Sequence, residues 1–204
     1  MSKQYNGFFV AVDGPNGVGK STLIDAIKDS IESLGFKVYT TREPTDTYLG
    51  TFVREFAETH SKESLACMVA ADRYEHIINE IYPKLRDEYL VITDRYFLSS
   101  LILQGMDGVK EEHIVNINYN ILKPDLQIAL WADEDTLKKR LSERGSLTRF
   151  EKNNQSQKEI LYMESGIKKL KEMGWVVLTV NNSDDLQKNI NTTSSYISKL
   201  WRKK

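Results

Sequence analysis

One short stretch near the N-terminus limits what this chain can fold into more than any other. The pattern Gly-x-x-x-x-Gly-Lys-Ser runs from Gly14 to Ser21, directly after the apolar run 8–12 and before residues with helical spacing. Glycines in such a loop let successive backbone N–H groups point inward at phosphate oxygens. The helix that begins near Lys20 adds its positive end. Because strand, loop and helix follow in the order that the pattern requires, we expect the loop to bind a nucleoside triphosphate.

Two side chains of this loop have predicted tasks of their own. Lys20 would place a positive charge on the outer phosphates, and the hydroxyl of Ser21 can join the shell of a Mg²⁺ ion. A glycine-rich turn without a ligand would need neither residue. We therefore expect Mg²⁺ as the cofactor.

Apolar runs alternate with helical patterns along the rest of the chain. The predicted strands are 8–12, 36–41, 89–93, 126–131 and 175–180. The predicted helices begin near 20, cover 63–87, 110–122 and 155–173, and begin again near 184, and Asp133 can cap a further helix. Strands that are apolar on both faces and alternate with helices form a parallel sheet covered on both sides. The expected architecture is one α/β domain over residues 1–204, with a five-stranded parallel sheet between two layers of helices.

Composition and charge exclude several other classes of protein. The 204 residues carry a net charge of −1, so no overall field draws the chain to nucleic acid or to an anionic membrane. The N-terminus lacks the apolar core of a signal peptide, and no apolar run reaches the ~18 residues of a membrane-spanning helix. The single cysteine, Cys67, stands in an apolar run, where we expect a small buried side chain. We therefore expect a cytoplasmic protein. No metal-site spacing relates the three histidines, His60, His76 and His113.

Charged residues follow the predicted strands, at the edge of a parallel sheet where ligands bind. Arg42 follows the second strand, Asp94 ends the third, and Arg95 comes next. Asp94 has the position of an acid that steadies Mg²⁺, and the arginines suit phosphate because their planar guanidinium groups hold two oxygens at once.

A basic segment over about 140–155 is predicted to fold over the ligand as a lid. Its arginines are Arg140, Arg144 and Arg149, around Gly145. A mobile arginine-rich lid suits phosphoryl transfer, because it stabilises charge on the transferred group and excludes water.

Taken together, these stretches resemble the thymidylate kinase family over nearly the whole chain. The matching stretches are the phosphate loop, TREP (41–44), AADRYEH (70–76), DRY with SS and QG (94–105), KPDL (123–126) and RGSLTRFE (144–151). The resemblance implies the three-layer P-loop NTPase fold in its nucleoside-monophosphate-kinase version, and usually a homodimer. It also implies transfer of the γ-phosphate of ATP to a nucleoside monophosphate, dTMP, with no nucleic acid polymer and no membrane as partner.

The resemblance further implies a role for individual residues. Contacts with ATP are implied for Gly14, Asn16, Gly17, Val18, Gly19, Lys20, Ser21, Thr22, Arg140 and Arg144. Contacts with the acceptor are implied for Asn16, Arg42, Val69, Arg73, Asp94, Arg95, Tyr96, Ser99, Leu103 and Gln104. The implied catalytic residues are Lys20, Arg95, Arg144 and Arg149, and those implied to hold the metal are Ser21 and Asp94. Family members without a basic residue in the loop supply it from the lid, and here Pro15, Asn16 and Val18 occupy those loop positions.

Several acceptor-side positions depart from the family pattern. Asn16 stands where the family usually carries an acid that reaches the sugar 3′-hydroxyl, and Val69 and Leu103 stand where it usually carries aromatic residues. Thr45 and Asp46 replace two expected glycines. Loss of base stacking costs about 1–3 kcal/mol for each aromatic removed. A divergent dTMP kinase and a kinase for another deoxynucleotide or a nucleoside both stay open.

Two further functions compete with a kinase. An acceptor-independent ATPase would need a glutamate after the strand-end acid to activate water, and Arg95 stands there instead. A nucleotide-binding module without catalysis is the other. Residues 181–185 follow the last strand and either contact adenine, as in the family, or cap a helix.

Overall fold

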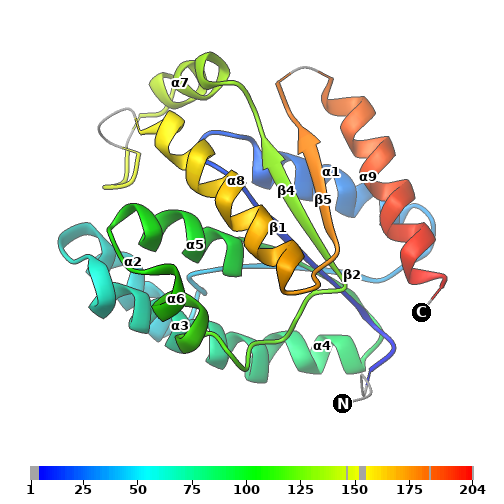
Figure 1. Cartoon of the computed structure of the whole chain (residues 1–204). Coiled ribbons are helices and arrows are strands. Elements are labelled where there is room, and N and C mark those ends of the chain that lie inside the picture. Colours follow the sequence, from blue (N-terminus) through cyan, green and yellow to red (C-terminus); the bar gives the residue numbers. More distant parts are fainter. Residues whose placement is uncertain (1–4, 146, 152–154, 184, 204) are drawn as a thin grey trace.

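Five parallel strands form the centre of the molecule (Figure 1). They are β1 (Phe8–Asp13), β2 (Val38–Arg42), β3 (Leu90–Asp94), β4 (Leu126–Trp131) and β5 (Val177–Asn181), in the spatial order β2-β3-β1-β4-β5. The computed structural model describes residues 5–145, 147–151, 155–183 and 185–203. The expected α/β architecture is confirmed, and each strand begins and ends within two residues of its predicted bounds.

Helices cover both faces of this sheet. The helices are α1 (Lys20–Glu32), α2 (Tyr48–Thr59), α3 (Lys62–His76), the π-helix η1 (Ile77–Ile81), α4 (Tyr82–Arg86), α5 (Phe97–Met106), α6 (Glu111–Ile117), α7 (Glu134–Ser142), α8 (Ser156–Glu172) and α9 (Leu186–Trp201). Side chains of β1 alternate between the two faces. Phe8 and Val10 pack in the core with α1 and α9, whereas Phe9 packs in the core with α5 and α8. Burial on both faces explains why the central strands β1, β3 and β4 are largely apolar without alternation.

The pairing of the strands brings the polar strand ends together. Val12 pairs with Asp94 across β1 and β3, and Arg42 pairs with Asp94 across β2 and β3. The loop after β1 therefore lies beside the first residues after β3, as expected for ligand binding at the carboxyl ends of a parallel sheet.

The predicted helix 63–87 is one continuous helical stretch that changes type near its end. It consists of α3, η1 and α4, in that order. Pro83 explains the change, because a proline ring clashes with the carbonyl four residues earlier in an α-helix, and a wider π turn relieves the clash. In η1 the N–H of Tyr82 accordingly bonds to the carbonyl of Ile77, five residues back.

The expected burial of Cys67 is wrong, because its side chain is exposed. Three other residues of the same helix are buried in the core: Leu65, Ala66 and Ala70. Cys67 lies on the face of the helix that points to solvent. An apolar run inside an amphipathic helix does not show which of its members face solvent.

Neither a membrane-spanning helix nor a metal-binding cluster is found in the part of the chain that the structure describes. Within those ranges, none of the helices is both long enough and apolar enough to cross a bilayer. The same residues contain no group of three or more His, Cys, Asp or Glu side chains suited to a metal ion.

Candidate active site

A cavity of about 610 Å³ opens at the carboxyl ends of β1, β2 and β3. The phosphate loop, α2, α3 and α5 all contribute side chains to its lining, together with Arg144, Thr148, Phe150 and Glu151. Every residue predicted to bind the acceptor lines this cavity, as do Gly17, Gly19, Lys20, Ser21, Thr22 and Arg144. Four predicted site residues do not line the cavity: Gly14, Val18, Arg140 and Arg149.

The phosphate loop is shaped by its glycines and by the lysine that crosses it. Gly19 has φ +92°, in the left-handed region that side chains rarely adopt, and it begins α1. The ammonium of Lys20 donates hydrogen bonds to the carbonyls of Gly14 (3.1 Å) and Pro15 (3.0 Å). Burial lowers the pKa of Lys20 to about 7, with a further contribution from the positive charge of Arg95. The loop thus holds its lysine in place before any phosphate arrives.

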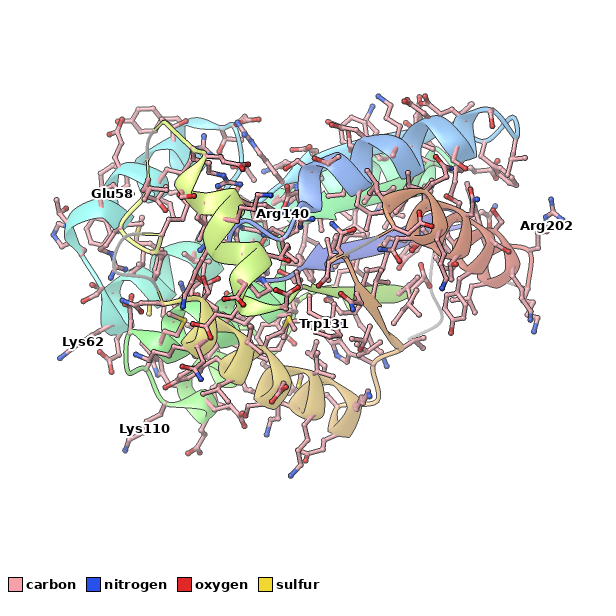
Figure 2. The ribbon with its side chains drawn as sticks, turned by 90° about the horizontal axis from the view of Figure 1, so that it is seen from above. Glu58, Lys62, Lys110, Trp131, Arg140 and Arg202 are labelled. Carbon is pink, nitrogen blue, oxygen red and sulfur yellow. The ribbon has the colours of Figure 1, made fainter. Side chains whose placement is uncertain are left out.

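Arg140, labelled in Figure 2, also holds this loop. Its guanidinium, on α7, donates to the carbonyls of Val18 (3.1 Å) and Asn182 (2.9 Å), and the amide of Asn182 also donates to Val18 (2.8 Å). Asp185 accepts from the N–H of Lys188 and caps α9. Asn182 therefore holds the phosphate loop, and Asp185 caps α9.

Ser21 and Asp94 form the pair where a Mg²⁺ ion would be expected. The hydroxyl of Ser21 donates to Oδ2 of Asp94 at 2.8 Å. Oδ1 of Asp94 is buried and has no hydrogen-bond partner among the described residues. A hydroxyl beside a carboxylate with a free oxygen fits Mg²⁺, which takes few protein ligands and keeps waters and phosphate oxygens.

Asp13, which the sequence analysis missed, fixes the start of α5. Its Oδ1 accepts from the backbone N–H groups of Tyr96 (2.8 Å) and Ser99 (3.0 Å), and its Oδ2 accepts from Gln127 (2.9 Å). Asp13 ends β1 directly before the loop. Its position at a strand end was a signal that could have identified it.

Two arginines of the predicted acceptor site lie at the phosphate end of the cavity. Arg95 donates to Oδ1 of Asn16 (2.6 Å) and to the hydroxyl of Ser99 (3.2 Å). Arg42 pairs with the carboxylate of Asp46, which also accepts from Arg54 (3.3 Å). The pairing raises the pKa of Arg42 and lowers that of Asp46. Asp46, one of the departures from the family pattern, thus holds an acceptor-side arginine.

The third predicted acceptor-side arginine, Arg73, lines the cavity and is almost fully buried. Its guanidinium is ion-paired with Glu43 (2.8 Å) and donates to the side chain of Asn118 (2.6 Å). It also donates to the carbonyl of Tyr96 and the hydroxyl of Ser100, both at 3.0 Å, and stacks on the Tyr96 ring. Four aliphatic side chains also line the cavity: Val53, Leu65, Val69 and Leu103. The cavity therefore combines charged and polar groups beside the phosphate loop with aliphatic side chains and the buried Arg73.

The arginines of the lid segment lie in different places. Arg144 lines the cavity and pairs with the carboxylate of Glu151. Arg149 is turned away from it: its guanidinium makes two hydrogen bonds to Asp107 (2.9 and 2.8 Å) and one to the carbonyl of Ala57 (2.7 Å). Residues 146 and 152–154 of the predicted lid lie outside the described residues.

Comparison with known proteins gives a consistent result. Residues 12–190 match the family model described as thymidylate kinase. The chain is 44% identical over 149 residues (71% of this chain, 73% of the relative) to Probable thymidylate kinase of Caldivirga maquilingensis. It is 32% identical over 192 residues (89% and 91%) to Probable thymidylate kinase of Thermococcus gammatolerans, and 36% identical over 156 residues (72% and 76%) to Thymidylate kinase of Caldicellulosiruptor saccharolyticus. The chain therefore belongs to the thymidylate kinase family, the ATP-dependent phosphotransferases that convert dTMP to dTDP.

Proposed function

We propose that the phosphate loop holds ATP and that the cavity between α2, α3 and α5 holds dTMP, with its phosphate toward the loop. The observation that carries this assignment is the set of groups that line the cavity. Lys20, Asp94 and Arg95 lie beside the loop, and the rest of the lining includes aliphatic side chains and the buried Arg73. A nucleotide has the matching chemistry: an anionic phosphate, a sugar, and a flat base with polar edges.

The reaction needs no covalent intermediate with the protein. An oxygen of the dTMP phosphate attacks the γ-phosphorus, the bond from that phosphorus to the β–γ bridging oxygen breaks, and ADP leaves. The attacking oxygen is already anionic, so positioning and charge stabilisation account for catalysis. Arg42 and Arg95 would hold the acceptor phosphate, and Lys20 would stabilise charge on the phosphates of ATP.

Ser21 and Asp94 are the residues that would hold Mg²⁺. When bound, the ion neutralises charge on the phosphate oxygens of ATP. The unpartnered oxygen of Asp94 supports this assignment.

The lid and the homodimer are also part of the proposal. Arg144 already faces the cavity, and Arg149 would reach the phosphates only after leaving Asp107. Closure of residues 140–155 would bring both toward the transferred group and exclude water. The homodimer would form through the long helical stretch of α3, η1 and α4, where Cys67, Ala71 and Ile78 are exposed.

A panel of nucleoside and deoxynucleoside monophosphates with ATP·Mg²⁺ tests the acceptor. ADP formation should depend on added nucleotide, and dTMP should give the highest kcat/KM. The activities on the other nucleotides show how strongly the cavity selects its base. Val69 and Leu103 offer less base stacking than the aromatic residues that the family usually carries at these positions. ADP formation that is independent of any acceptor would contradict the proposal.

A further inference from the structure

Glu159 on α8 is joined to Arg95 through a single loop residue, Asn16. Oε2 of Glu159 accepts from the backbone N–H of Asn16 at 2.6 Å, and Oε1 accepts from its side-chain amide at 3.1 Å. The other atom of that amide, Oδ1, accepts from the guanidinium of Arg95 at 2.6 Å. Glu159 is 2% exposed and Asn16 is 6% exposed, so water competes little for these bonds.

The chemistry of the three groups allows only one orientation of the central amide. A carboxylate can only accept hydrogen bonds, and a guanidinium can only donate them. Asn16 must therefore turn its NH₂ group to Glu159 and its oxygen to Arg95. If the amide were reversed, two acceptors would face each other on one side and two donors on the other. The charge of Glu159 thus determines which atom Arg95 meets.

Glu159 lies outside the cavity but acts, through Asn16, on Arg95, which lines it. Asn16 and Arg95 line the cavity, whereas Glu159 lies behind Asn16 and does not. Ser99 accepts from the other terminal nitrogen of Arg95 at 3.2 Å, so both ends of the guanidinium are held. Glu159 also opposes the lowering of the Lys20 pKa, because its negative charge favours the ammonium.

We propose that Glu159 is a positioning residue for phosphoryl transfer. It orients the amide of Asn16, and through it aims Arg95 at the acceptor phosphate. Because Glu159 stands in the first turn of α8, the first helix after the lid segment, it also ties that end of α8 to the phosphate loop. The inference rests on the proposed function, since it assigns Arg95 to the acceptor phosphate.

Single substitutions at Glu159 test the orientation. Glu159→Gln keeps the shape but adds an NH₂ group that must face either the backbone N–H or the amide NH₂ of Asn16. We expect the KM for dTMP to rise about tenfold and kcat to fall, because a charge-assisted bond is lost, while the KM for ATP changes less than about threefold. Glu159→Asp keeps the charge but is one methylene shorter, and should give a smaller loss. Glu164→Gln is the matched control, since it removes a carboxylate from an exposed position on the same helix.

A combined substitution separates positioning from a merely structural role. Asn16→Asp alone would set a second carboxylate about 3 Å from Glu159, where like charges repel. Its activity should be low at pH 8 and rise toward pH 6, as the pair takes up a proton. When Asn16→Asp is combined with Glu159→Gln, the introduced glutamine amide can donate to the new carboxylate, which accepts directly from Arg95. The double variant should be at least about tenfold more active than Asn16→Asp at pH 8 and lose the rise at low pH.

The possible results are distinguishable. If wild type forms no dTDP from dTMP, the proposed function fails. If wild type is active and Glu159→Gln keeps its KM for dTMP, the inference fails and the function stands. A lower melting temperature in Glu159→Gln without a change in either KM, or additive effects in the double variant, would also overturn the inference.

Discussion

Lys20 is buried among groups of both charges. Burial and Arg95 lower its pKa to about 7, while Asp94, Glu159 and Asp13 act in the opposite direction. Its hydrogen bonds to two loop carbonyls hold the ammonium where phosphate oxygens would arrive. Two predictions concern this residue.

The first is that Lys20→Ala lowers kcat for dTMP phosphorylation by at least about two orders of magnitude. The substitution removes a positive charge from the phosphates on which charge develops in the transition state. Steady-state assays with ATP and dTMP measure the loss. Lys28→Ala, on the same helix but outside the cavity, is the control. Near-normal turnover of Lys20→Ala would refute the assignment of the loop.

The second is that binding of ATP takes up protons above pH 7. With a pKa of about 7 in the free enzyme, Lys20 is mostly neutral at pH 8, and the triphosphate raises that pKa because it favours the ammonium. Calorimetry in buffers of different ionisation enthalpy should find an uptake of up to about 0.9 proton at pH 8 and little at pH 6, where Lys20 is already charged. Lys20→Met should abolish the difference. An equal uptake in wild type and Lys20→Met would contradict the pKa assignment.

Val69 is the residue whose replacement tests the base-binding half of the cavity. Val69→Phe adds a ring at a position that lines the cavity, one helical turn from Arg73. Stacking on the base should lower the KM for dTMP about tenfold, within the range of ~1–3 kcal/mol for such contacts. The KM for ATP serves as the internal control and should not change. An unchanged or higher KM for dTMP would mean that the base lies elsewhere.

Sequence reasoning identified residues that stand in recognisable positions and missed those that act through distant partners. Arg42 and Asp94 end strands and Arg95 follows one, so the rule that ligands bind at the carboxyl ends of a parallel sheet identified them. Glu159 is separated from Asn16 by 143 positions, and no local pattern links the two. The roles of the cavity residues stay predictions until the variants are measured.

At the scale of elements, Arg149 attaches the predicted lid segment to α2 and to the end of α5. Arg149 binds Asp107 at the end of α5 and the carbonyl of Ala57 in α2, and its backbone N–H donates to Glu58 (3.1 Å). This attachment keeps Arg149 out of the cavity. The segment must release it if Arg149 is to meet the phosphates.

Asp107→Asn should loosen this segment. The substitution removes the charge from a two-bond ion pair, so trypsin should cleave after Arg144 and Arg149 about fivefold faster in the ligand-free protein. Mass spectrometry of the early fragments gives the rates. Glu112→Gln, an exposed change nearby on α6, should leave them unaltered. Equal cleavage of all three proteins would show that other contacts hold the segment.

The helices that sequence reasoning missed show what periodicity can and cannot reveal. The sequence of α5, FLSSLILQGM, is almost wholly buried, so no polar face marks a helical period. The helix α2 begins after Thr47, whose side chain accepts from the N–H of Gly50. It stands directly after the TREP motif, and this stretch was interpreted as a loop at the end of a strand. The central strands β1, β3 and β4 were predictable because short, largely apolar runs between helices have few other places in an α/β fold.

For the whole molecule, the proposed homodimer can be tested at the exposed surface of α3 and η1. If two copies pair through α3 and η1, a charge at the exposed Ala71 or Ile78 would be buried without a partner. Ala71→Glu with Ile78→Glu should convert a dimer into a monomer, as measured by light scattering after size exclusion. Leu161→Glu, on the exposed side of α8, is the control. A wild type that is already monomeric would exclude the dimer.

The family and the fold were both predictable at this scale. The thymidylate kinase resemblance rested on motifs spread over the chain, and the match to residues 12–190 confirms it. The three-layer architecture followed from the alternation of strands and helices. The lid over 140–155 stays a prediction, since its position with substrates bound depends on the ligands themselves.

Arg95 has a backbone conformation that would suit glycine better, with φ +72°. Its N–H donates to the carbonyl of Val12, and its own carbonyl accepts from the hydroxyl of Thr93, so the chain is locked in this shape. A left-handed residue with a side chain costs about 1–2 kcal/mol. The backbone therefore gives up part of its folding stability at the residue that directly follows β3 and contacts Asn16 of the phosphate loop. If Arg95 binds the acceptor phosphate as proposed, a glycine here would stabilise the fold and weaken the enzyme.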